Sequence, residues 1–312
     1  LTRQYPGQRN VALRLLEPLG APEEWTGGDA AARPIVEPAA STGVAIVFER
    51  VAVRAAGHTL LEAIDLAVRP GDHVAIVGPS GAGKSTLVGV LLGWHRPAAG
   101  QVRVDGAPLD GERLERLRRE TAWVDPSVQL WNRSFLDNLS YGVATDAAPP
   151  FGRAIETAAL RAVLERLPEG FQTRLGEGGS RLSGGEGQRV RFGRGLLRPG
   201  ARLAILDEPF RGLDRARRRE LLDRARRWWR EATLLCVTHD VGETLAFDRV
   251  LVVERGRLVE EGAPDLLARR PASRYRALLD AEEAVKQGSW SGATWRRLRL
   301  EAGRLVEDSE RS

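Results

Sequence analysis

The sequence predicts an α/β fold with a parallel sheet core, an antiparallel β-layer and a helical subdomain. The apolar run HVAIVG (73–78) enters a glycine-rich loop and then a helical pattern. Residues 202–262 alternate strand, helix and strand. Parallel strands need crossover connections, which helices usually supply, so this alternation favours a parallel sheet. The apolar alternation of VAIVFERVAVR, which begins at Val44, is typical of the antiparallel layer.

Composition limits the class of protein. The 312 residues are 42% hydrophobic and 29% charged, which suits one large globular domain with appendages. A single cysteine, Cys236, excludes an internal disulfide framework. A membrane-spanning helix needs about 20 apolar residues, and the runs here are far shorter. The chain starts at Leu1 and contains no methionine, so we expect a piece of a longer protein.

Basic charge is concentrated in RARRRELLDRARRWWRE (215–231), within a chain of net charge +5. The apolar residues of this segment recur at the spacing of one helical stripe: Leu221, Leu222, Ala225, Trp228 and Trp229. The arginines therefore indicate the solvated face of a packed helix, and we expect no nucleic-acid partner.

Three regions are expected along the chain. Residues 1–43 are rich in Pro, Ala, Gly and Glu, as in a linker that follows an upstream domain. Residues 44–280 form the main domain, with a helical subdomain at about 112–190 that includes AIETAALRAVLERL. Residues 281–312 form an extension in which LEAGRLVED, around Gly303, predicts a β-hairpin.

A phosphate-binding loop is predicted at GPSGAGKST (78–86), which fits G-x-x-x-x-G-K-[ST] between a strand and a helix. Its backbone N–H groups would cradle phosphates, Lys84 would reach the β- and γ-oxygens, and Ser85 would ligate Mg²⁺. The positive end of the following helix adds to this anion site. The nucleotide-binding residues are thus Gly78, Ser80, Gly81, Ala82, Gly83, Lys84, Ser85 and Thr86.

Two carboxylates end the apolar strand RLAILDEP (202–209). An apolar strand has no structural need for adjacent acids at its end, whereas a Mg-nucleotide site uses both. Asp207 would hold the metal, and Glu208 would orient and polarise the attacking water.

The segment RLSGGEGQR (181–189) makes the chain resemble the nucleotide-binding domain of the ATP-binding cassette (ABC) family over about residues 44–280. The resemblance implies a P-loop NTPase fold with a RecA-like core. It also implies that Ser183, Gly184 and Gly185 reach the ATP held by a second cassette in a head-to-tail dimer. FRGLD (210–214) resembles the loop that contacts that dimer, through Asp214, and VTHD (237–240) implies that His239 is a catalytic switch near the γ-phosphate.

Two segments resemble the exporter branch of the family: TRLGEGGSRLSGG (173–185), with Glu177 at its centre, and SFLDNLSYG. This resemblance implies an ATPase that uses ATP and Mg²⁺ to power export. It also implies a transmembrane domain, fused upstream or separate, and a location on the cytoplasmic face of the cell membrane. Two alternatives stay open: a soluble cassette ATPase outside transport, and a catalytically weak cassette in a heterodimer.

The sequence departs from the family pattern twice. The aromatic residue that stacks on adenine is replaced by Ala55, beside Arg54. The loop glutamine that touches Mg²⁺ or the attacking water is replaced by Pro126. Asp125 or Gln129 could take over its role, and Asp125 is the better Mg²⁺ ligand; a rigid docking loop without metal contact is the other interpretation. We expect the departure to alter coupling rather than chemistry.

Overall fold

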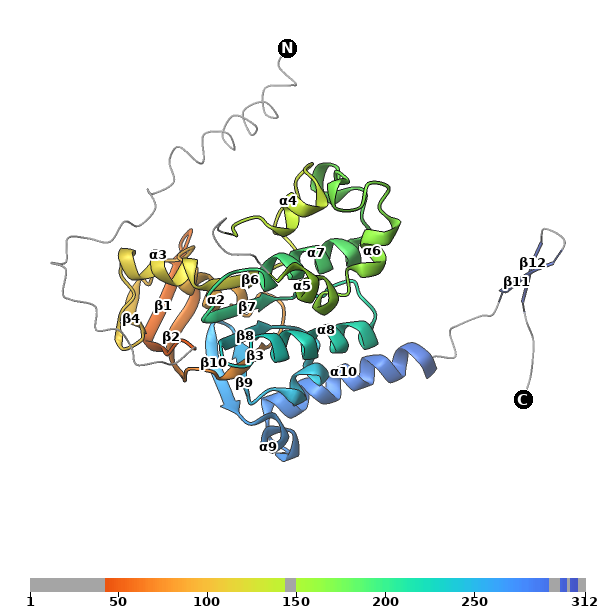
Figure 1. Ribbon diagram of the computed structural model, residues 1–312. Coiled ribbons are helices and arrows are strands. Elements are labelled where there is room, and N and C mark those ends of the chain that lie inside the picture. Colours follow the sequence, from red (N-terminus) through yellow and green to blue (C-terminus); the bar gives the residue numbers. More distant parts are fainter. Residues whose placement is uncertain (1–42, 144–149, 292–297, 302–303, 308–312) are drawn as a thin grey trace, which may run out of the picture.

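The computed structural model describes residues 43–143, 150–291, 298–301 and 304–307 (Figure 1). The expected linker, residues 1–43, lies outside the described residues except for Gly43. No helix in the described ranges has the length and apolar character needed to cross a membrane.

A six-stranded sheet forms the centre of the domain, in the order β10-β9-β3-β8-β7-β6. The run from β9 to β6 is parallel, and β10 joins the edge antiparallel to β9. The predicted parallel core is therefore confirmed. Its strands are β3 (His73–Val77), β6 (Thr121–Val124), β7 (Leu203–Asp207), β8 (Thr233–Val237), β9 (Arg249–Glu254) and β10 (Arg257–Gly262).

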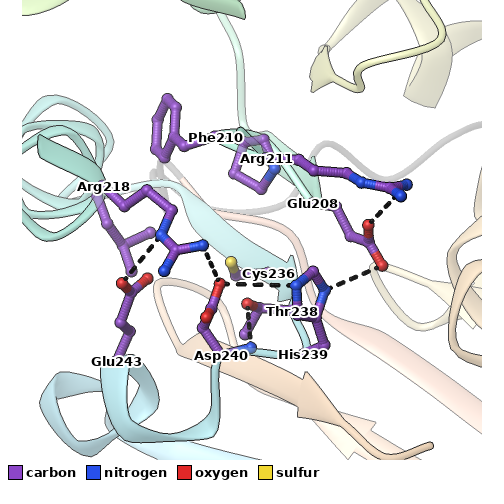
Figure 2. A pocket seen from close by; sticks show the side chains of 11 residues that line it. Glu208, Phe210, Arg211, Arg218, Cys236, Thr238, His239, Asp240 and Glu243 are labelled. Atoms are coloured by element: carbon purple, nitrogen blue, oxygen red, sulfur yellow. Dashed lines mark hydrogen bonds and ion pairs between the residues drawn. The ribbon is translucent and has the colours of Figure 1, made fainter. Parts of the chain in front are cut away.

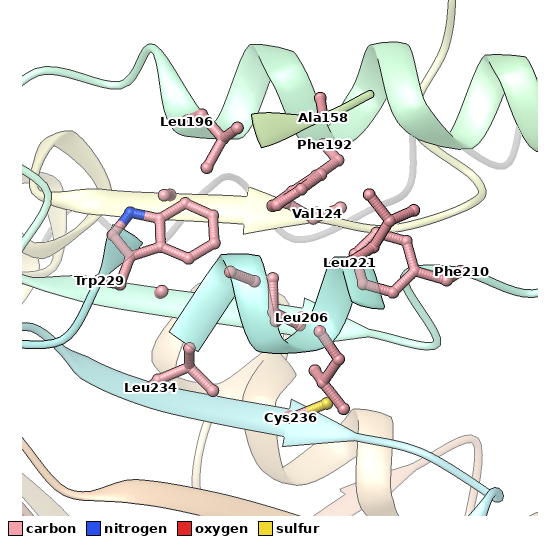
Figure 3. Close-up of a cluster of buried hydrophobic side chains, with 14 of the residues drawn as sticks. Val124, Ala158, Phe192, Leu196, Leu206, Phe210, Leu221, Trp229, Leu234 and Cys236 are labelled. Carbon is pink, nitrogen blue, oxygen red and sulfur yellow. The ribbon is translucent and has the colours of Figure 1, made fainter. Parts of the chain in front are cut away.

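Both faces of this sheet are buried, because successive side chains of each strand enter different cores. On β7, Leu203 and Ile205 face the core shared with the β-layer. Ala204 and Leu206 face the core beneath the helices. Figure 3 shows part of this second core, where Phe192 lies close to Phe210 and Trp229, with ring centroids 5.2 and 6.0 Å away.

The predicted antiparallel layer is a four-stranded sheet in the order β2-β1-β4-β5. Ala56 and Gly57, with φ of +47° and +79°, form the tight turn between β1 and β2, as expected where both turn residues need positive φ. Its strands are β1 (Ile46–Ala55), β2 (His58–Val68), β4 (Ala99–Val104) and β5 (Ala107–Pro108). Side chains of α2 (Lys84–Leu91) and α3 (Gly111–Arg119) pack into its core.

The helical region contains α4 (Phe135–Leu139), α5 (Phe151–Thr157), α6 (Arg161–Arg166) and α7 (Gly184–Leu196), with short 3₁₀ turns η2 (Gly170–Gln172) and η3 (Glu177–Gly179). The sequence assignment was wrong at one place here. Thr121–Val124, within the range expected to be mainly helical, is the core strand β6, because it pairs with β7.

The segment AIETAALRAVLERL is helical, as expected, and it contributes to two helices, α5 and α6. Ala159 between them has a φ of +52°. The break places Ala158 and Leu160 together beneath Gly193 of α7, where a Cβ on that glycine would lie 3.6 and 2.9 Å from their side chains. Tertiary packing against α7 thus overrides the local helical pattern.

The arginine-rich segment forms α8 (Arg215–Trp228). Four of the five residues of its predicted apolar stripe, Leu221, Leu222, Ala225 and Trp229, are at most 6% exposed. The fifth, Trp228, is half-buried. On the other face, Glu220 pairs with arginines on both sides of it along the helix. The interpretation of 215–231 as a packed amphipathic helix is therefore confirmed.

The chain continues after the sheet through η4 (Val241–Ala246), α9 (Pro264–Arg269) and α10 (Arg274–Ser291). The expected domain boundary at residue 280 falls inside α10. This helix holds η4 at two points: Glu282 accepts a hydrogen bond from the Gly242 backbone N–H at 2.8 Å, and the Tyr275 hydroxyl bonds Thr244. Leu298–Glu301 and Arg304–Glu307 pair antiparallel as β11 and β12.

Candidate nucleotide-binding and hydrolysis site

The glycine-rich loop leaves β3 at Gly78 and enters α2 at Lys84. A Cβ on Gly78 would lie 2.0 Å from the carbonyl oxygen of Val253, so only glycine fits where the loop passes β9. Gly83, with a φ of +104°, begins the helix. Ala82 is buried and accepts a hydrogen bond from Gly256 N–H. The remaining loop residues are open to solvent or half-buried: Ser80, Gly81, Ser85 and Thr86.

Lys84 is folded back onto its own loop. Its Nζ donates to the carbonyl oxygens of Gly78 and Pro79, both at 2.9 Å. Burial lowers the pKa of this ammonium, and the negative charges of Glu208 and Asp207 oppose that shift. The lysine is therefore held at the mouth of the loop by weak neutral acceptors, which a phosphate oxygen can replace.

Asp207 ends β7 and hydrogen-bonds to Ser85 of the loop. Burial is the main cause that raises its pKa to about 6; the charges of Asp125 and Glu208 act in the same direction, and the Ser85 bond and Lys84 act against the shift. A buried carboxylate whose ionised form is this unfavourable gains from a cation. Ser85 and Asp207 thus lie together, as expected for a Mg²⁺ site, and their chemistry fits that ion.

Glu208 has a φ of +44°, in a backbone region that costs about 1–3 kcal/mol for a residue with a side chain. Its carboxylate lies 3.4 Å from Nδ1 of His239 and 3.7 Å from the guanidinium of Arg211 (Figure 2). The His239 side chain is 53% exposed, so its ring is accessible from solvent. The two residues expected to be catalytic are therefore brought together at the carboxyl ends of β7 and β8.

The glycine turn at 183–185 begins α7. Ser183 accepts a hydrogen bond from Glu186 N–H, and the Glu186 side chain bonds the Ser183 N–H in return, which is a capping box. Ser183 and Gly184 are exposed. A Cβ on Gly185 would lie 2.4 Å from the side chain of Leu213, so this turn packs against the loop that carries Asp214.

Asp214 begins α8, where its side chain accepts the Arg217 backbone N–H at 2.9 Å. The residue is exposed. It therefore lies at the surface, as a residue that contacts a second subunit must.

Asp125 and Gln129, the two candidates for the missing loop glutamine, differ in position. Asp125 follows β6 directly, and its Oδ1 accepts the Ser127 backbone N–H at 2.6 Å. Gln129 is exposed, and its backbone carbonyl accepts a hydrogen bond from Arg194. Of these two, Asp125 is the one close enough to influence the charge state of Asp207.

Arg54 and Ala55, at the expected adenine position, are exposed at the end of β1. The register of the β1–β2 hairpin pairs Ala55 with His58 and Arg54 with Thr59. His58, which no sequence pattern singled out, therefore lies opposite the alanine and brings an imidazole to this position.

An aromatic hollow of about 440 Å³ lies beside the loop at 123–139 and was not predicted. Its lining includes Trp94, Trp123, Trp131, Tyr141 and Arg194. The Arg194 guanidinium lies 4.8 Å from the Trp131 ring centre, and burial lowers its pKa to about 10. The Trp123 indole nitrogen is buried without a hydrogen-bond partner. Trp123, Trp131 and Tyr141 come from one stretch of the sequence, and the fold brings Trp94 and Arg194 to them from distant segments.

A parallel sheet whose strand β3 runs into a glycine loop, with paired carboxylates at the end of another core strand, defines a P-loop NTPase. Comparison with known proteins narrows this class. Residues 61–211 match the family model described as "ABC transporter". The matched segment is therefore an ATP-binding cassette of the ABC family.

Relatives and a solved structure agree with this family. An ATP-dependent lipid A-core flippase of Alkalilimnicola ehrlichii is 37% identical over 220 residues, which are 70% of this chain and 37% of the flippase. The Xylella fastidiosa flippase is 35% identical over 262 residues, 83% of this chain and 43% of the relative. The mycobactin import ATP-binding/permease protein IrtB of Mycolicibacterium thermoresistibile is 36% identical over 228 residues, 72% of this chain and 39% of the relative.

The structure of a bacterial Atm1-family ABC exporter with ATP bound superposes with a TM-score of 0.76 at 27% identity. The match covers 89% of this chain and 48% of the exporter. The chain thus spans less than half the length of each of these proteins.

Proposed function

We propose that the chain is a cassette that binds and hydrolyses ATP to power export, working with a second cassette and a transmembrane domain at the cytoplasmic face of the cell membrane. The observation that carries the hydrolytic part is the contact between Glu208 and His239, 3.4 Å apart, beside a phosphate loop whose Ser85 bonds Asp207. A cassette that only bound nucleotide would not need this pair.

The phosphate loop and Asp207 suit Mg-ATP. Lys84 and the loop N–H groups would hold the phosphates, while Ser85 and Asp207 would hold Mg²⁺, which supplies positive charge against the phosphate oxygens. Glu208 would orient the attacking water and accept its proton. His239 would hold Glu208 on one side and face the terminal phosphate on the other.

A second cassette is proposed because the glycine turn at residues 183–185 is exposed. Ser183 and Gly184 face solvent, and Ser183 bonds only within the first turn of its own helix among the contacts described. In a head-to-tail pair, this turn and Asp214 would close the ATP site of the other cassette. The N-terminus of α7 would then add a positive dipole end near the phosphates.

A transmembrane partner is proposed at the aromatic hollow. Trp94 and Tyr141, both in its lining, are 48% and 56% exposed, which is unusual for large apolar side chains in the described surface. We propose export as the direction of transport because the similar proteins include the flippases and the Atm1-family exporter. A relative named for import is 36% identical.

The proposal is tested with the single substitution Glu208→Gln. The 312-residue chain should hydrolyse ATP, and Glu208→Gln should slow hydrolysis by about 10²-fold or more, as expected when one transition-state group is lost. ATP should also convert Glu208→Gln into a dimer on a sizing column.

The control is Glu220→Gln, the same change of side chain on the solvent-facing side of α8, where Glu220 pairs with neighbouring arginines of its own helix. It should change neither hydrolysis nor dimerisation. A Glu208→Gln chain that hydrolyses ATP as fast as the wild type, or that stays monomeric at saturating ATP, contradicts the proposal.

A further inference from the structure

Arg218 joins the helix after the dimer-contact loop to the loop that carries His239. Its guanidinium NH1 lies 2.8 Å from Oδ2 of Asp240, and its Nε lies 3.4 Å from Oε1 of Glu243. Figure 2 shows Arg218 reaching from α8 between these two carboxylates. One guanidinium is therefore shared by two acids of the segment that follows His239.

The bridge is shielded from water. The side chains of Arg218 and Asp240 are each 20% exposed, and that of Glu243 is 6% exposed. Burial raises the pKa of Glu243, the charge of Asp240 raises it further, and Arg218 opposes both. The Nε–Oε1 contact is an ion pair without a hydrogen bond, because both atoms lack a hydrogen-bond partner among the described residues. The short contact of the guanidinium is the one with Asp240. Removal of one member of a shielded ion pair leaves the other charge uncompensated.

The same Asp240 oxygen that binds Arg218 also lies near His239. The Oδ2 atom is 3.8 Å from His239 Nε2, just beyond hydrogen-bond distance. The other ring nitrogen, Nδ1, faces Glu208 at 3.4 Å. The imidazole thus lies between the carboxylates of Glu208 and Asp240. The ion pair with Arg218 holds the Asp240 carboxylate away from the ring.

Without Arg218, no contact in this network would prevent the Asp240 side chain from rotating toward Nε2 of His239. A carboxylate that accepts the Nε2–H would occupy the nitrogen that, in the proposed function, faces the terminal phosphate. Its negative charge would also repel that phosphate. The bridge therefore keeps one face of His239 available.

Arg218 is linked to the dimer-contact loop through the backbone. Asp214 begins α8, and the Arg218 N–H donates to the Asp214 carbonyl at 2.9 Å. A displacement of Asp214 on contact with a second cassette would be carried through one helical turn to Asp240.

We propose that Arg218 is a positioning residue for His239: it binds Asp240 away from the imidazole and ties the His239 loop to Asp214. This inference rests on the proposed ATP hydrolysis for its consequence in turnover, but its geometric part can be measured without turnover.

The experiment compares three forms of the 312-residue chain with the wild type. Arg218→Met removes the charge at similar length. The double variant Arg218→Met/Asp240→Asn also removes the carboxylate that would be released. Arg219→Met changes the exposed neighbouring arginine of α8 and is the matched control.

The first measurement is the pH titration of the His239 imidazole by NMR, with the signal assigned by its loss in His239→Gln. The charged groups that line the same pocket as this ring are Glu208 and Arg211 after β7, Arg218 on α8, Asp240 in its own loop and Glu243 on η4. A newly unpaired carboxylate beside the ring favours the imidazolium. Arg218→Met should therefore raise the titration midpoint by about one pH unit, and the double variant should return it to the wild-type position.

The second measurement is ATP turnover. Arg218→Met should lower kcat about tenfold or more while KM for ATP changes less than about twofold, because the phosphate loop is untouched. The double variant should recover most of the loss. Arg218→Lys, which keeps a point charge but not the fork, should give an intermediate result and replaces Arg218→Met if that variant does not fold.

Each outcome has one meaning. An unchanged His239 midpoint in Arg218→Met, or a double variant as slow as Arg218→Met, overturns the positioning role. A wild-type chain without ATP hydrolysis overturns the proposed function, and the NMR shifts still decide whether Arg218 holds Asp240 off the ring.

Discussion

Asp125 and Asp207 occupy adjoining positions at the carboxyl ends of two neighbouring parallel strands. Val124 of β6 pairs with Leu206 of β7, and each aspartate is the next residue of its chain segment. Neighbouring strands are about 4.8 Å apart, and residues in register point to the same face of a sheet. The carboxylate that follows β6 is therefore placed toward the predicted metal site, where relatives of this family carry a glutamine a residue later.

This relationship separates the two candidates for the missing glutamine. Asp125→Ala should lower ATP hydrolysis and raise the Mg²⁺ concentration needed for half-maximal activity, because a carboxylate near the ion is lost. Gln129→Ala, at an exposed position bonded through its backbone, should change little. A Mg²⁺ titration of ATP turnover checks both. Loss of activity in Gln129→Ala with a silent Asp125→Ala would show that Asp125 is not the replacement.

The absence of an aromatic residue at Ala55 should loosen the preference for adenine. Stacking on a ring contributes about 1–3 kcal/mol, so Ala55→Tyr should tighten ATP binding by about one to two decades. Calorimetry in the Glu208→Gln background prevents turnover during the measurement. His58 pairs with Ala55 across the hairpin. If Ala55→Tyr leaves the affinity unchanged and His58→Ala weakens it, the imidazole already stacks on the base.

His73 should make the fold acid-sensitive. Its Nε2 lies 3.1 Å from the Trp229 carbonyl and its Nδ1 accepts from Arg226, so the ring is held neutral. Burial lowers its pKa below 6.5 in the fold. The unfolded chain then binds a proton more readily. This contribution to stability is fully present above pH 6.5 and is lost as the pH falls below it.

The corresponding measurement is Tm against pH, from about pH 5 to about pH 7.5, a range that brackets the ordinary pKa of histidine. His73→Gln keeps a donor for the Trp229 carbonyl but cannot titrate. It should therefore flatten the acid side of the Tm curve. A wild-type slope that persists in His73→Gln would assign the acid sensitivity to other groups.

Adjacent tryptophans at the end of α8 should differ in their effect on stability. Trp229 is 4% exposed and packs against Phe192, so Trp229→Ala should lower the free energy of unfolding by about 3–5 kcal/mol. Trp228 is half-buried and lies under Arg153 at the surface, so Trp228→Ala should cost distinctly less. Urea unfolding of both variants provides the comparison. Equal losses would contradict the packing described for this helix.

Much of the fold follows from patterns that lie within short segments. The strand that precedes Gly78, the acids after β7 and the stripe of α8 are each local, and the structure contains them. What the sequence did not show depends on distant partners. β6 is a strand because β7 lies beside it, and the break at Ala159 follows the surface of α7.

The residues of the candidate site divide in the same way, into those that a local motif predicts and those that only the fold brings together. Lys84, Ser85, Asp207 and Glu208 could be found from their own motifs. Arg218 could not, because in the sequence it is one arginine among many on an amphipathic helix. Its importance comes from Asp240, which lies beyond the whole of α8 and β8 in the chain but 2.8 Å away in space.

The contacts of α10 bear on where the chain can be shortened. Tyr275 is fully buried, and Glu282 holds the Gly242 N–H only a few residues after His239. A deletion that began at residue 274 would expose a buried face of η4 and release the segment that follows His239. The smallest piece of this chain that keeps the geometry around His239 therefore extends beyond β10 and into α10.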